Sequence, residues 1–506
     1  MTSIADQVDL LVVGGGINGA GIARDAVGRG LTVLLCEQHD LAAHTSSSST
    51  KLIHGGLRYL EHMEFMLVRK ALAEREVLLA VAPHIIWPLR FVLPYEPHLR
   101  PAWMIRAGLF LYDHLARRRR LPGSRSIDLR RHPAGVPLSH RDRYGFEYSD
   151  GWVDDARLVV LNALDAHERG AQIRVGVRCS RIVKERGGWS ATLIADGGAR
   201  HQIRARAVVN AAGPWVGRFL DQATPVRASR AVRLVKGSHI IVPRLFEHAY
   251  AYIFQNVDRR IIFAIPYQHE FTLIGTTDVE FHDDPERVAI AADEVAYLCE
   301  LASHYFATKV TPAQVVSTYS GVRPLLEDES SDPSSVTRDY SFELDADGPP
   351  LLSVFGGKIT TYRRLAEDGL ALLLPLLGSR APPWTKAVPL PGGDMPDADF
   401  DAFRSSLTSR YPALPAALLD RWSRAYGTRL GAMLGAADTV AGLGEAVLPG
   451  LHAIEIDYLR RVEWARSAAD ILWRRSKLGL HLPRDAAALL DSWLAQHAVS
   501  PQAAST

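Results

Sequence analysis

The sequence predicts an α/β protein that carries an inserted, mainly antiparallel β-sheet domain and ends in an all-α domain. Three observations point to this fold class. A buried strand leads into a glycine-rich turn and a helix near the N-terminus, at residues 8–27. Strand patterns separated by turns fill residues 234–275, and after a proline-rich stretch at residues 381–393 the patterns are helical. At 506 residues the chain is too long for one core, so several domains are expected.

Residues 8–37 have the order of a Rossmann-like βαβ unit. The apolar runs Val8–Val13 and Thr32–Cys36 predict two buried parallel strands, and residues 20–27 between them predict a helix. The turn Gly14-Gly15-Gly16-Ile17-Asn18-Gly19 lies between the first strand and the helix. Glu37 ends the second strand.

This glycine turn and Glu37 together predict a dinucleotide site. Gly14 allows the tight turn, Gly16 lets a pyrophosphate approach the backbone, and Gly19 lets the helix pack close to the strand. The helix N-terminus offers free N–H groups to the phosphates. A carboxylate at Glu37 accepts hydrogen bonds from a ribose diol. Glycine turns alone are common, but with both strands, the helix and the acid they indicate dinucleotide binding, with contacts from Gly14, Gly15, Gly16, Asn18, Gly19 and Glu37.

The segment behind Glu37 favours FAD over NAD. Residues 45–51 are rich in hydroxyls, and FAD, the longer molecule, must continue across the protein at this place. A solvated loop with helix-capping serines would have the same composition. Two later segments, residues 208–215 and 356–362, also combine small residues with hydroxyls at a strand end and a helix start. The expected FAD contacts from these three segments, and from His54 and Gly55 directly after the first of them, are Ser46, Ser47, Ser48, Lys51, His54, Gly55, Ala212, Gly213, Gly357, Lys358 and Thr360.

These pieces are far apart in the chain, so the FAD-binding domain must be discontinuous, over residues 1–90, 145–225 and 315–380. Residues 226–314 would form the substrate-binding sheet, and residues 91–144 a basic amphipathic insert. The linker 381–393 precedes a helical domain at residues 394–506. There, helical patterns cover residues 400–410, 416–425, 454–475 and 484–497.

The motifs resemble those of one family, the FAD-dependent glycerol-3-phosphate dehydrogenases of the aerobic, membrane-associated type. Among the matching segments are GGGINGAGIARDA at 14–26, SSTKLIHGGLRYLEH at 48–62, YSGVRPL at 319–325 and FGGKITTYRRLAE at 355–367. The resemblance implies an FAD-binding fold shared with glycine oxidase and D-amino-acid oxidase. It also implies oxidation of sn-glycerol 3-phosphate to dihydroxyacetone phosphate, with hydride transfer to flavin N5 and electrons passed to a membrane quinone.

Within this family reading, five side chains are candidates for substrate chemistry. A phosphate-bearing substrate needs cations in a fixed fork, so Arg58 and Arg323, both beside glycines, are the expected phosphate ligands, with the Tyr59 hydroxyl nearby. Lys358 is expected near the substrate or the flavin N1–C2 edge. His239 is the expected general base, because imidazole titrates near neutral pH. Surface ion pairs for the arginines and a backbone-bonded strand histidine are the alternatives.

Composition limits the remaining classes. The net charge of +2 gives no general argument for nucleic-acid binding, and three scattered cysteines indicate neither a disulfide framework nor a metal site. No secretory signal and no membrane-spanning run is seen, so we expect a cytoplasmic protein. Residues 100–143 hold eleven arginines against three aspartates. The apolar arc of residues 103–115 beside them fits either a core helix or a helix lying on the anionic cytoplasmic face of the membrane, and quinone reduction favours the second.

Two further alternatives stay open. An oxidase of the same group would pass its electrons to oxygen, and a non-catalytic flavoprotein would bind FAD at a membrane without turning over substrate. A homodimer is also compatible with the sequence.

Overall fold

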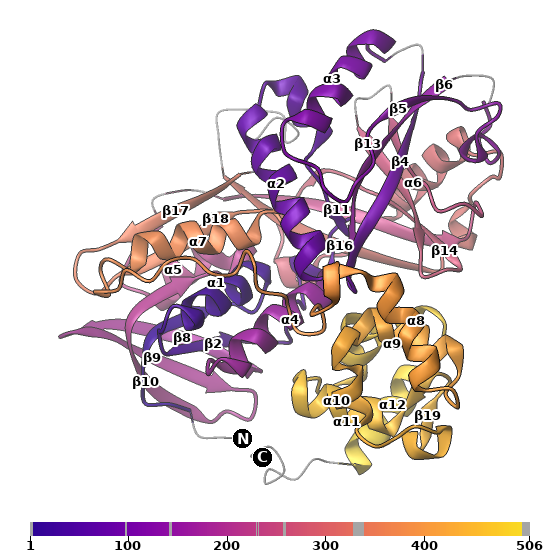
Figure 1. The fold of residues 1–506 in the computed structure, drawn as a ribbon. Helices are drawn as coiled ribbons and strands as arrows, with labels where there is room; N and C mark the ends of the chain where they lie inside the picture. The colour runs from indigo at the N-terminus through magenta and orange to yellow at the C-terminus, as the bar shows by residue number, and fades with distance from the viewer. Residues whose placement is uncertain are drawn as a thin grey trace.

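The computed structural model describes residues 4–96, 99–140, 144–228, 230, 232–256, 260–326 and 339–497. It confirms the predicted fold class: an α/β domain, a second, mainly antiparallel sheet and a helical C-terminal domain (Figure 1). No helix in these ranges is long and apolar enough to cross a membrane.

The first sheet is the Rossmann-like core. Its parallel centre joins β1, β2, β7, β10 and β18, with β17 antiparallel at one edge and the β8–β9 hairpin attached to β10. Helices α1, α4 and α7 pack together over a shared apolar core on one face (Figure 1). The strands and helices are β1 (Gln7–Val13), α1 (Ile17–Gly28), β2 (Val33–Glu37), α4 (Asp155–Glu168), β7 (Gln172–Val175), β8 (Val177–Glu185), β9 (Gly188–Ala195), β10 (Arg200–Asn210), α5 (Val216–Ala223), β17 (Tyr340–Asp345), β18 (Leu351–Gly356) and α7 (Tyr362–Leu373).

The second sheet has the order β15-β11-β14-β13-β12-β4-β6-β3, with β16 paired to β11 and β5 paired to β6. Its pairings are antiparallel except for that of β12 with β4. The elements are β3 (Leu52–Ile53), α2 (Phe65–Val81), β4 (Ile86–Pro94), α3 (Ala102–His114), β5 (Arg125–Asp128), β6 (Tyr144–Val153), β11 (Val232–Pro243), β12 (Ala251–Gln255), β13 (Ile261–Tyr267), β14 (Phe271–Gly275), β15 (Val279–Glu280), α6 (Ala292–Tyr305) and β16 (Ser317–Leu326).

This sheet uses more of the chain than residues 226–314, the range expected for it. Strands β3, β4, β5, β6 and β16 come from segments that the sequence assigned to the FAD domain or to the basic insert. Strand pairing across such distances leaves no periodic pattern in the sequence, because periodicity reports which face is buried and not which strand is the neighbour. Strand β3 directly follows the hydroxyl-rich residues 45–51, the cofactor segment, and the Thr45 hydroxyl of this segment bonds to β16.

The C-terminal domain contains α8 (Phe400–Arg410), α9 (Ala416–Tyr426), α10 (Leu430–Leu434), α11 (Ala453–Val462), α12 (Ala486–Gln496) and a small pair of strands, β19 (Ala446–Leu448) and β20 (Leu451–His452). One long helix was expected over residues 454–475, and that expectation is wrong. Helix α11 ends at Val462, Trp464 takes a left-handed backbone conformation, and the chain resumes as a π-helix at Asp470–Arg475. The Asp470 carboxylate accepts the backbone N–H groups of Arg466 and Ser467, which caps the new start.

Helix α3 divides its apolar side chains between core and solvent. Leu109 and Tyr112 are buried, whereas Trp103 and Phe110 are 70% and 54% exposed. Asp113 is buried and accepts hydrogen bonds from the backbone and hydroxyl of Ser124. The helix is therefore anchored by one face and presents large apolar side chains on the other.

Candidate active site

The glycine turn closes around the end of β1 as its spacing predicts. Gly14 has a φ of +111°, and a Cβ at this position would lie 2.5 Å from the Ala211 carbonyl oxygen. The Gly15 N–H donates to the Glu37 carboxylate at 2.6 Å, and the Ile17 N–H at the start of α1 donates to the Ser46 hydroxyl at 3.0 Å. A cradle of backbone N–H groups and small side chains thus faces the end of the first sheet.

A cavity of about 320 Å³ opens beside this cradle. That size is at the lower end of small-ligand sites in proteins. Burial raises the pKa of Glu37, although the N–H groups of His39 and Gly15 oppose the shift. The lining combines the glycine turn, Glu37 and the residues that follow it, one edge of β8 and the small residues after β10, including Gly14, Gly15, Gly16, Glu37, Ser46, Cys179, Ala212, Gly213 and Trp215.

The hydroxyl-rich run joins this cavity to the second sheet. The Thr45 hydroxyl donates to the Val322 carbonyl of β16 at 2.7 Å, and the Ser47 hydroxyl donates to the His44 carbonyl at 3.2 Å. A Cβ at Gly321 would lie 2.7 Å from the Ser48 Cβ, so β16 approaches the run at a glycine. The run is therefore fixed against the strand that carries Arg323.

Lys51 lies within the run, but its ammonium group already has partners. It is buried and bonded to both carboxylate oxygens of Asp155, at 2.8 and 2.9 Å, and to the Ser47 carbonyl at 2.9 Å. The same carboxylate accepts the Ser49 hydroxyl at 2.7 Å. In this arrangement Lys51 holds the run in shape, and its charge is neutralised by Asp155, which is itself fully buried.

The glycines at 55–56 and 356–357 meet on the other side of the run. The His54 N–H donates to the Thr360 hydroxyl at 3.3 Å, and the Gly55 N–H donates to the Tyr112 hydroxyl at 2.8 Å. The Asn18 amide, from the first glycine turn, donates to the Gly356 carbonyl at 3.2 Å. These contacts bring the N-terminal turn, residues 54–55 and the start of α7 to one place.

Lys358 and Tyr59 lie together at this point. The Lys358 ammonium nitrogen is 3.9 Å from the centre of the Tyr59 ring, a cation–π distance. Arg58 precedes Tyr59 on the same short helical segment, Leu57–His62, and is partly exposed. Three of the five expected substrate residues are thus neighbours on two segments 300 residues apart in the chain.

His239 occupies the centre of β11, opposite Tyr319 of β16. Its ring stacks on the Tyr319 ring with centroids 4.7 Å apart, and its Nε2 is 3.0 Å from the Thr50 hydroxyl of the cofactor segment. Nδ1 has no hydrogen-bond partner within the described part of the chain. Burial, followed by the positive charges of Lys51 and Arg323, lowers the pKa of His239 well below its ordinary value. The imidazole is therefore neutral at physiological pH.

Arg323 reaches the same region from β16. Its guanidinium forms an ion pair with Asp278 at 2.8 Å and donates to the Thr277 carbonyl at 3.3 Å. Its side chain is 27% exposed. Arg323 is thus oriented by an acid yet keeps an exposed edge.

Two residues of this site, Thr50 and Tyr319, are not predicted by the sequence. Thr50 contacts the edge of the His239 ring at Nε2 and Tyr319 stacks on its face, and both residues belong to segments that carry the family resemblance. Their partner becomes evident only when β16 pairs with β11 in register, His239 with Tyr319. The sequence indicated the segments that carry these residues, whereas only the tertiary structure shows their contacts with His239.

The comparisons with known proteins agree with this geometry. Residues 9–363 match the family described as FAD dependent oxidoreductase, and residues 383–497 match the C-terminal domain of alpha-glycerophosphate oxidase. The chain belongs to the FAD dependent oxidoreductase family. FAD is its cofactor. The cradle, the cavity and Asn18 fit this group, because the glycines of the cradle place no side chain in its path.

Relatives within the family confirm the resemblance drawn from the motifs. A glycerol-3-phosphate dehydrogenase of Pseudomonas aeruginosa is 56% identical over 95% of this chain and 93% of its own length. The aerobic glycerol-3-phosphate dehydrogenase of Escherichia coli is 49% identical, covering 97% of each chain. A D-erythritol 1-phosphate dehydrogenase of Brucella abortus is 50% identical over 96% of this chain and 98% of its own.

A solved structure supports the same assignment. The glycerol-3-phosphate dehydrogenase of Bacillus halodurans complexed with FAD superposes with a TM-score of 0.74 at 27% identity, covering 97% of this chain and 88% of the other. The protein is therefore an FAD-dependent oxidoreductase of the glycerol-3-phosphate dehydrogenase type.

Proposed function

We propose that the protein oxidises sn-glycerol 3-phosphate to dihydroxyacetone phosphate and passes the electrons to a membrane quinone. The observation that carries the proposal is the neutral, buried His239 at the joint between the cofactor segment and the substrate sheet. The names of the relatives support the substrate. When bound, FAD supplies the two-electron acceptor for the hydrogen that leaves the carbinol carbon as hydride.

His239 is the proposed base for the hydroxyl proton. A neutral imidazole accepts a proton, and Nε2 faces the Thr50 hydroxyl and hence the cofactor segment. The stacked Tyr319 ring and the Thr50 contact fix the imidazole plane, so proton transfer needs no reorientation of the ring.

Arg323 and Arg58 are the proposed phosphate ligands, and Lys358 is the proposed cation beside the reacting atoms. A guanidinium matches the geometry of phosphate oxygens, and Asp278 holds that of Arg323 in place. We expect the partly exposed edge of Arg323 to bind the phosphate while the Asp278 contact is kept.

A second substrate has specific support. The identity of the D-erythritol 1-phosphate dehydrogenase of Brucella abortus to this chain, 50%, lies between those of the Pseudomonas aeruginosa and Escherichia coli glycerol-3-phosphate dehydrogenases, 56% and 49%. Both substrates combine a phosphate with a secondary alcohol, so a pocket lined by cations and a base would serve either. The two substrates differ in length, so the size of the pocket, and not His239, would distinguish between them.

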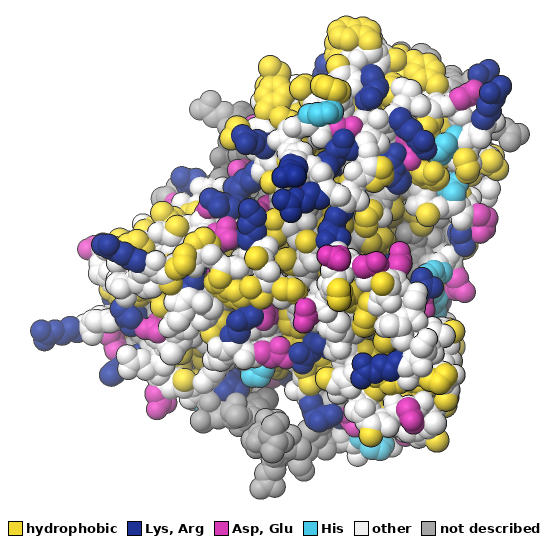
Figure 2. Space-filling model, in the orientation of Figure 1, with side chains coloured by type: hydrophobic (Ala, Val, Ile, Leu, Met, Phe, Trp, Pro, Cys, Tyr) yellow, Lys and Arg dark blue, Asp and Glu magenta, His cyan; other side chains and the backbone are white. Residues whose placement is uncertain are grey.

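The proposed membrane contact is made by α3. Trp103, Met104, Phe110 and Leu111 are exposed on this helix, and Figure 2 shows hydrophobic side chains gathered at the end of the molecule where α3 lies, with Lys and Arg side chains below them. Aromatic and apolar side chains at headgroup depth, beside cations that face anionic lipid, are typical of peripheral membrane binding at the cytoplasmic face.

An anaerobic titration tests the substrate. The FAD-loaded protein is mixed with sn-glycerol 3-phosphate or D-erythritol 1-phosphate, and bleaching of the flavin absorbance is recorded by stopped flow. We expect complete bleaching at lower concentrations of sn-glycerol 3-phosphate. Faster bleaching by D-erythritol 1-phosphate would identify that compound as the preferred substrate. No bleaching by either compound would refute the proposed dehydrogenase activity.

Reoxidation of the reduced enzyme tests the acceptor. We expect a short-chain quinone to restore the flavin absorbance much faster than air does. Rapid reoxidation by oxygen with release of peroxide would instead identify an oxidase.

A further inference from the structure

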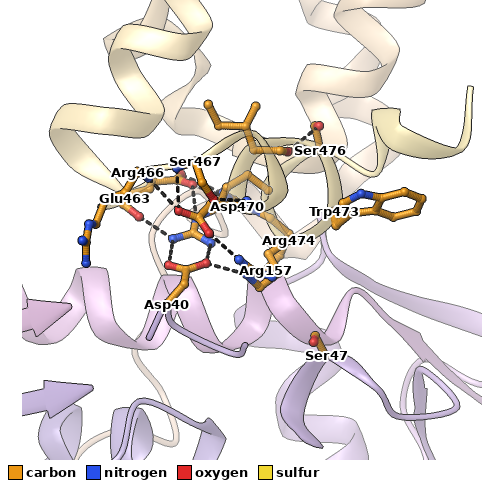
Figure 3. Close-up of polar contacts among 12 residues, drawn as sticks. Asp40, Ser47, Arg157, Glu463, Arg466, Ser467, Asp470, Trp473, Arg474 and Ser476 are labelled. Atoms are coloured by element: carbon orange, nitrogen blue, oxygen red, sulfur yellow. Dashed lines mark hydrogen bonds and ion pairs between the residues drawn. The ribbon is translucent and has the colours of Figure 1, made fainter. Parts of the chain in front are cut away.

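In the loop between β2 and the hydroxyl-rich run, the Asp40 side chain lies outside the lining of the cofactor cavity. Gln38 and residues 42–46 line the cavity, together with Glu37 at the end of β2. Asp40 lies among them in sequence, but its carboxylate is buried against the C-terminal domain (Figure 3). The loop is therefore held between the cofactor site and a domain about 430 residues further along the chain.

Three N–H groups of the C-terminal domain bind this carboxylate. Arg475 donates from both terminal nitrogens, at 2.7 Å to Oδ2 and 2.8 Å to Oδ1, and Arg474 donates from Nε at 2.5 Å. The bidentate arrangement fixes the carboxylate plane as well as its position. Burial would raise the pKa of Asp40, but the guanidinium groups of Arg475 and Arg474 hold it below its usual value.

Arg475 is in turn fixed to the Rossmann-like domain at a second point. It donates to the Glu463 backbone carbonyl at 2.7 Å, and the Glu463 carboxylate is bonded to the guanidinium of Arg157 on α4. Arg475, Glu463 and Arg157 are 1%, 0% and 1% exposed, so solvent does not screen this chain of charges.

Other contacts also hold the loop, among them the His39 carbonyl accepting the Gly176 N–H at 3.0 Å and the Thr45 hydroxyl donating to the Val322 carbonyl at 2.7 Å. The Ala42 N–H donates to the Gly15 carbonyl at 3.1 Å, and the His39 N–H donates to the Glu37 carboxylate at 2.8 Å. Ala42 has a φ of +61°, a left-handed conformation that an alanine adopts only when its surroundings impose it. The Asp40 contacts lie two residues from this strained position, where they can supply that restraint.

We propose that the C-terminal domain clamps the FAD-binding loop, residues 38–46, through Asp40, and that Asp40, Arg475 and Glu463 are positioning residues for FAD. The clamp holds Glu37 and Ser46 at the correct distance from the glycine turn. Because binding and domain docking then share one loop, FAD binding and attachment of the C-terminal domain stabilise each other by the same free energy. The inference rests on FAD binding and is independent of which substrate the enzyme oxidises.

The test measures FAD affinity. Asp40→Asn keeps the shape of the side chain and removes its charge, Arg475→Met removes the fork, and the double variant removes both. We expect each single variant to weaken FAD binding at least about tenfold, because it leaves the partner's charge buried and uncompensated. The double variant should be no weaker than the singles. The readout is the fluorescence of FAD released from the holoenzyme, which does not depend on catalysis.

Arg421→Met is the matched control. Arg421 forms a comparable two-point ion pair with Glu455, at 2.6 and 2.7 Å, but both residues belong to the C-terminal domain. We expect this variant to lower the melting temperature while FAD affinity stays within about twofold of wild type. Equal loss of FAD from the control and from Asp40→Asn would overturn the clamp, and so would folded Asp40→Asn and Arg475→Met proteins with wild-type affinity.

Hydrogen exchange of the unmodified protein keeps the proposal testable if these variants do not fold. FAD should slow amide exchange in residues 38–46 and also in residues 463–476. Slower exchange confined to residues 38–46 would contradict the proposed coupling.

Discussion

The two ends of the candidate active site are built in opposite ways. Around Gly14 and Glu37 the site consists mainly of backbone groups and small side chains at the ends of strands. Around His239 it consists of interacting side chains from three distant segments, with His239 buried and Thr50 and Tyr319 partly buried. We therefore expect added atoms to disrupt FAD binding at the first end. At the second end, we expect the loss of a charge or hydrogen bond to impair turnover or substrate binding.

The largest effect is expected from Gly14→Ala. The new Cβ would meet the Ala211 carbonyl oxygen in a left-handed backbone conformation, so the turn must move out of the phosphate position. We expect the variant to purify without FAD, as measured by the ratio of flavin to protein absorbance. Gly30→Ala is the control, because Gly30 also has a positive φ but open space around it, and it should keep its FAD.

His239→Gln should lower kcat by about 10²–10⁴-fold, the usual contribution of a general base. FAD content should not change, since the residue lies outside the cavity beside the glycine turn. Steady-state kinetics with a soluble electron acceptor measure the effect, with His248→Gln, on the loop after β11, as the control. An unchanged kcat would remove His239 from the chemistry.

Arg323→Gln should act on substrate binding more than on turnover. Loss of charge-assisted hydrogen bonds to a phosphate corresponds to about 1.5–3 kcal/mol, or about 10–100-fold in KM. Arg233→Gln is the control, because Arg233 lies on β11 in the same sheet and pairs with Glu280. A KM equal to that of wild type would refute the phosphate assignment.

The pH dependence tests the neutral state of His239. A lowered pKa means that the active, neutral form persists as the pH falls through about 6.5, the ordinary value for histidine. At saturating substrate, kcat should therefore stay level through that pH and decline only below it. Since the Arg323 charge contributes to the shift, Arg323→Gln should move the decline to higher pH. A midpoint at the ordinary value in the wild type would contradict the buried, neutral base.

The smallest effect on turnover is expected from the Trp103→Ser, Phe110→Ser double variant. With a soluble acceptor, kcat should stay within about twofold, because both side chains face away from the core. Co-sedimentation with anionic vesicles should fall sharply, since each side chain loses roughly 1.5–3 kcal/mol of apolar burial. Leu489→Ser, an exposed site on α12, is the control and should sediment like wild type. Equal sedimentation of all three proteins would exclude α3 as the anchor.

The sequence by itself determined the Rossmann-like entry and the nature of the cofactor. Glycine spacing, the two apolar strands and Glu37 act over a few turns of chain, and local spacing is what a sequence states directly. The same holds for β11, β12, β13 and β14 of the second sheet and for α8, α9 and α12. Lys51 shows the limit of such local prediction. Its position beside the serines predicts a contact with FAD, whereas in the fold its ammonium group is bonded to Asp155.

Only the tertiary structure decided which side chains meet. Pairing of β11 with β16 sets His239 on Tyr319, and docking of the C-terminal domain sets Arg475 on Asp40. Neither contact leaves a trace in periodicity or composition, since both depend on strand order and on domain packing between residues far apart in the chain. The break at Glu463–Ser467 has the same origin: a capped start and a buried ion pair override the helical pattern of residues 454–475.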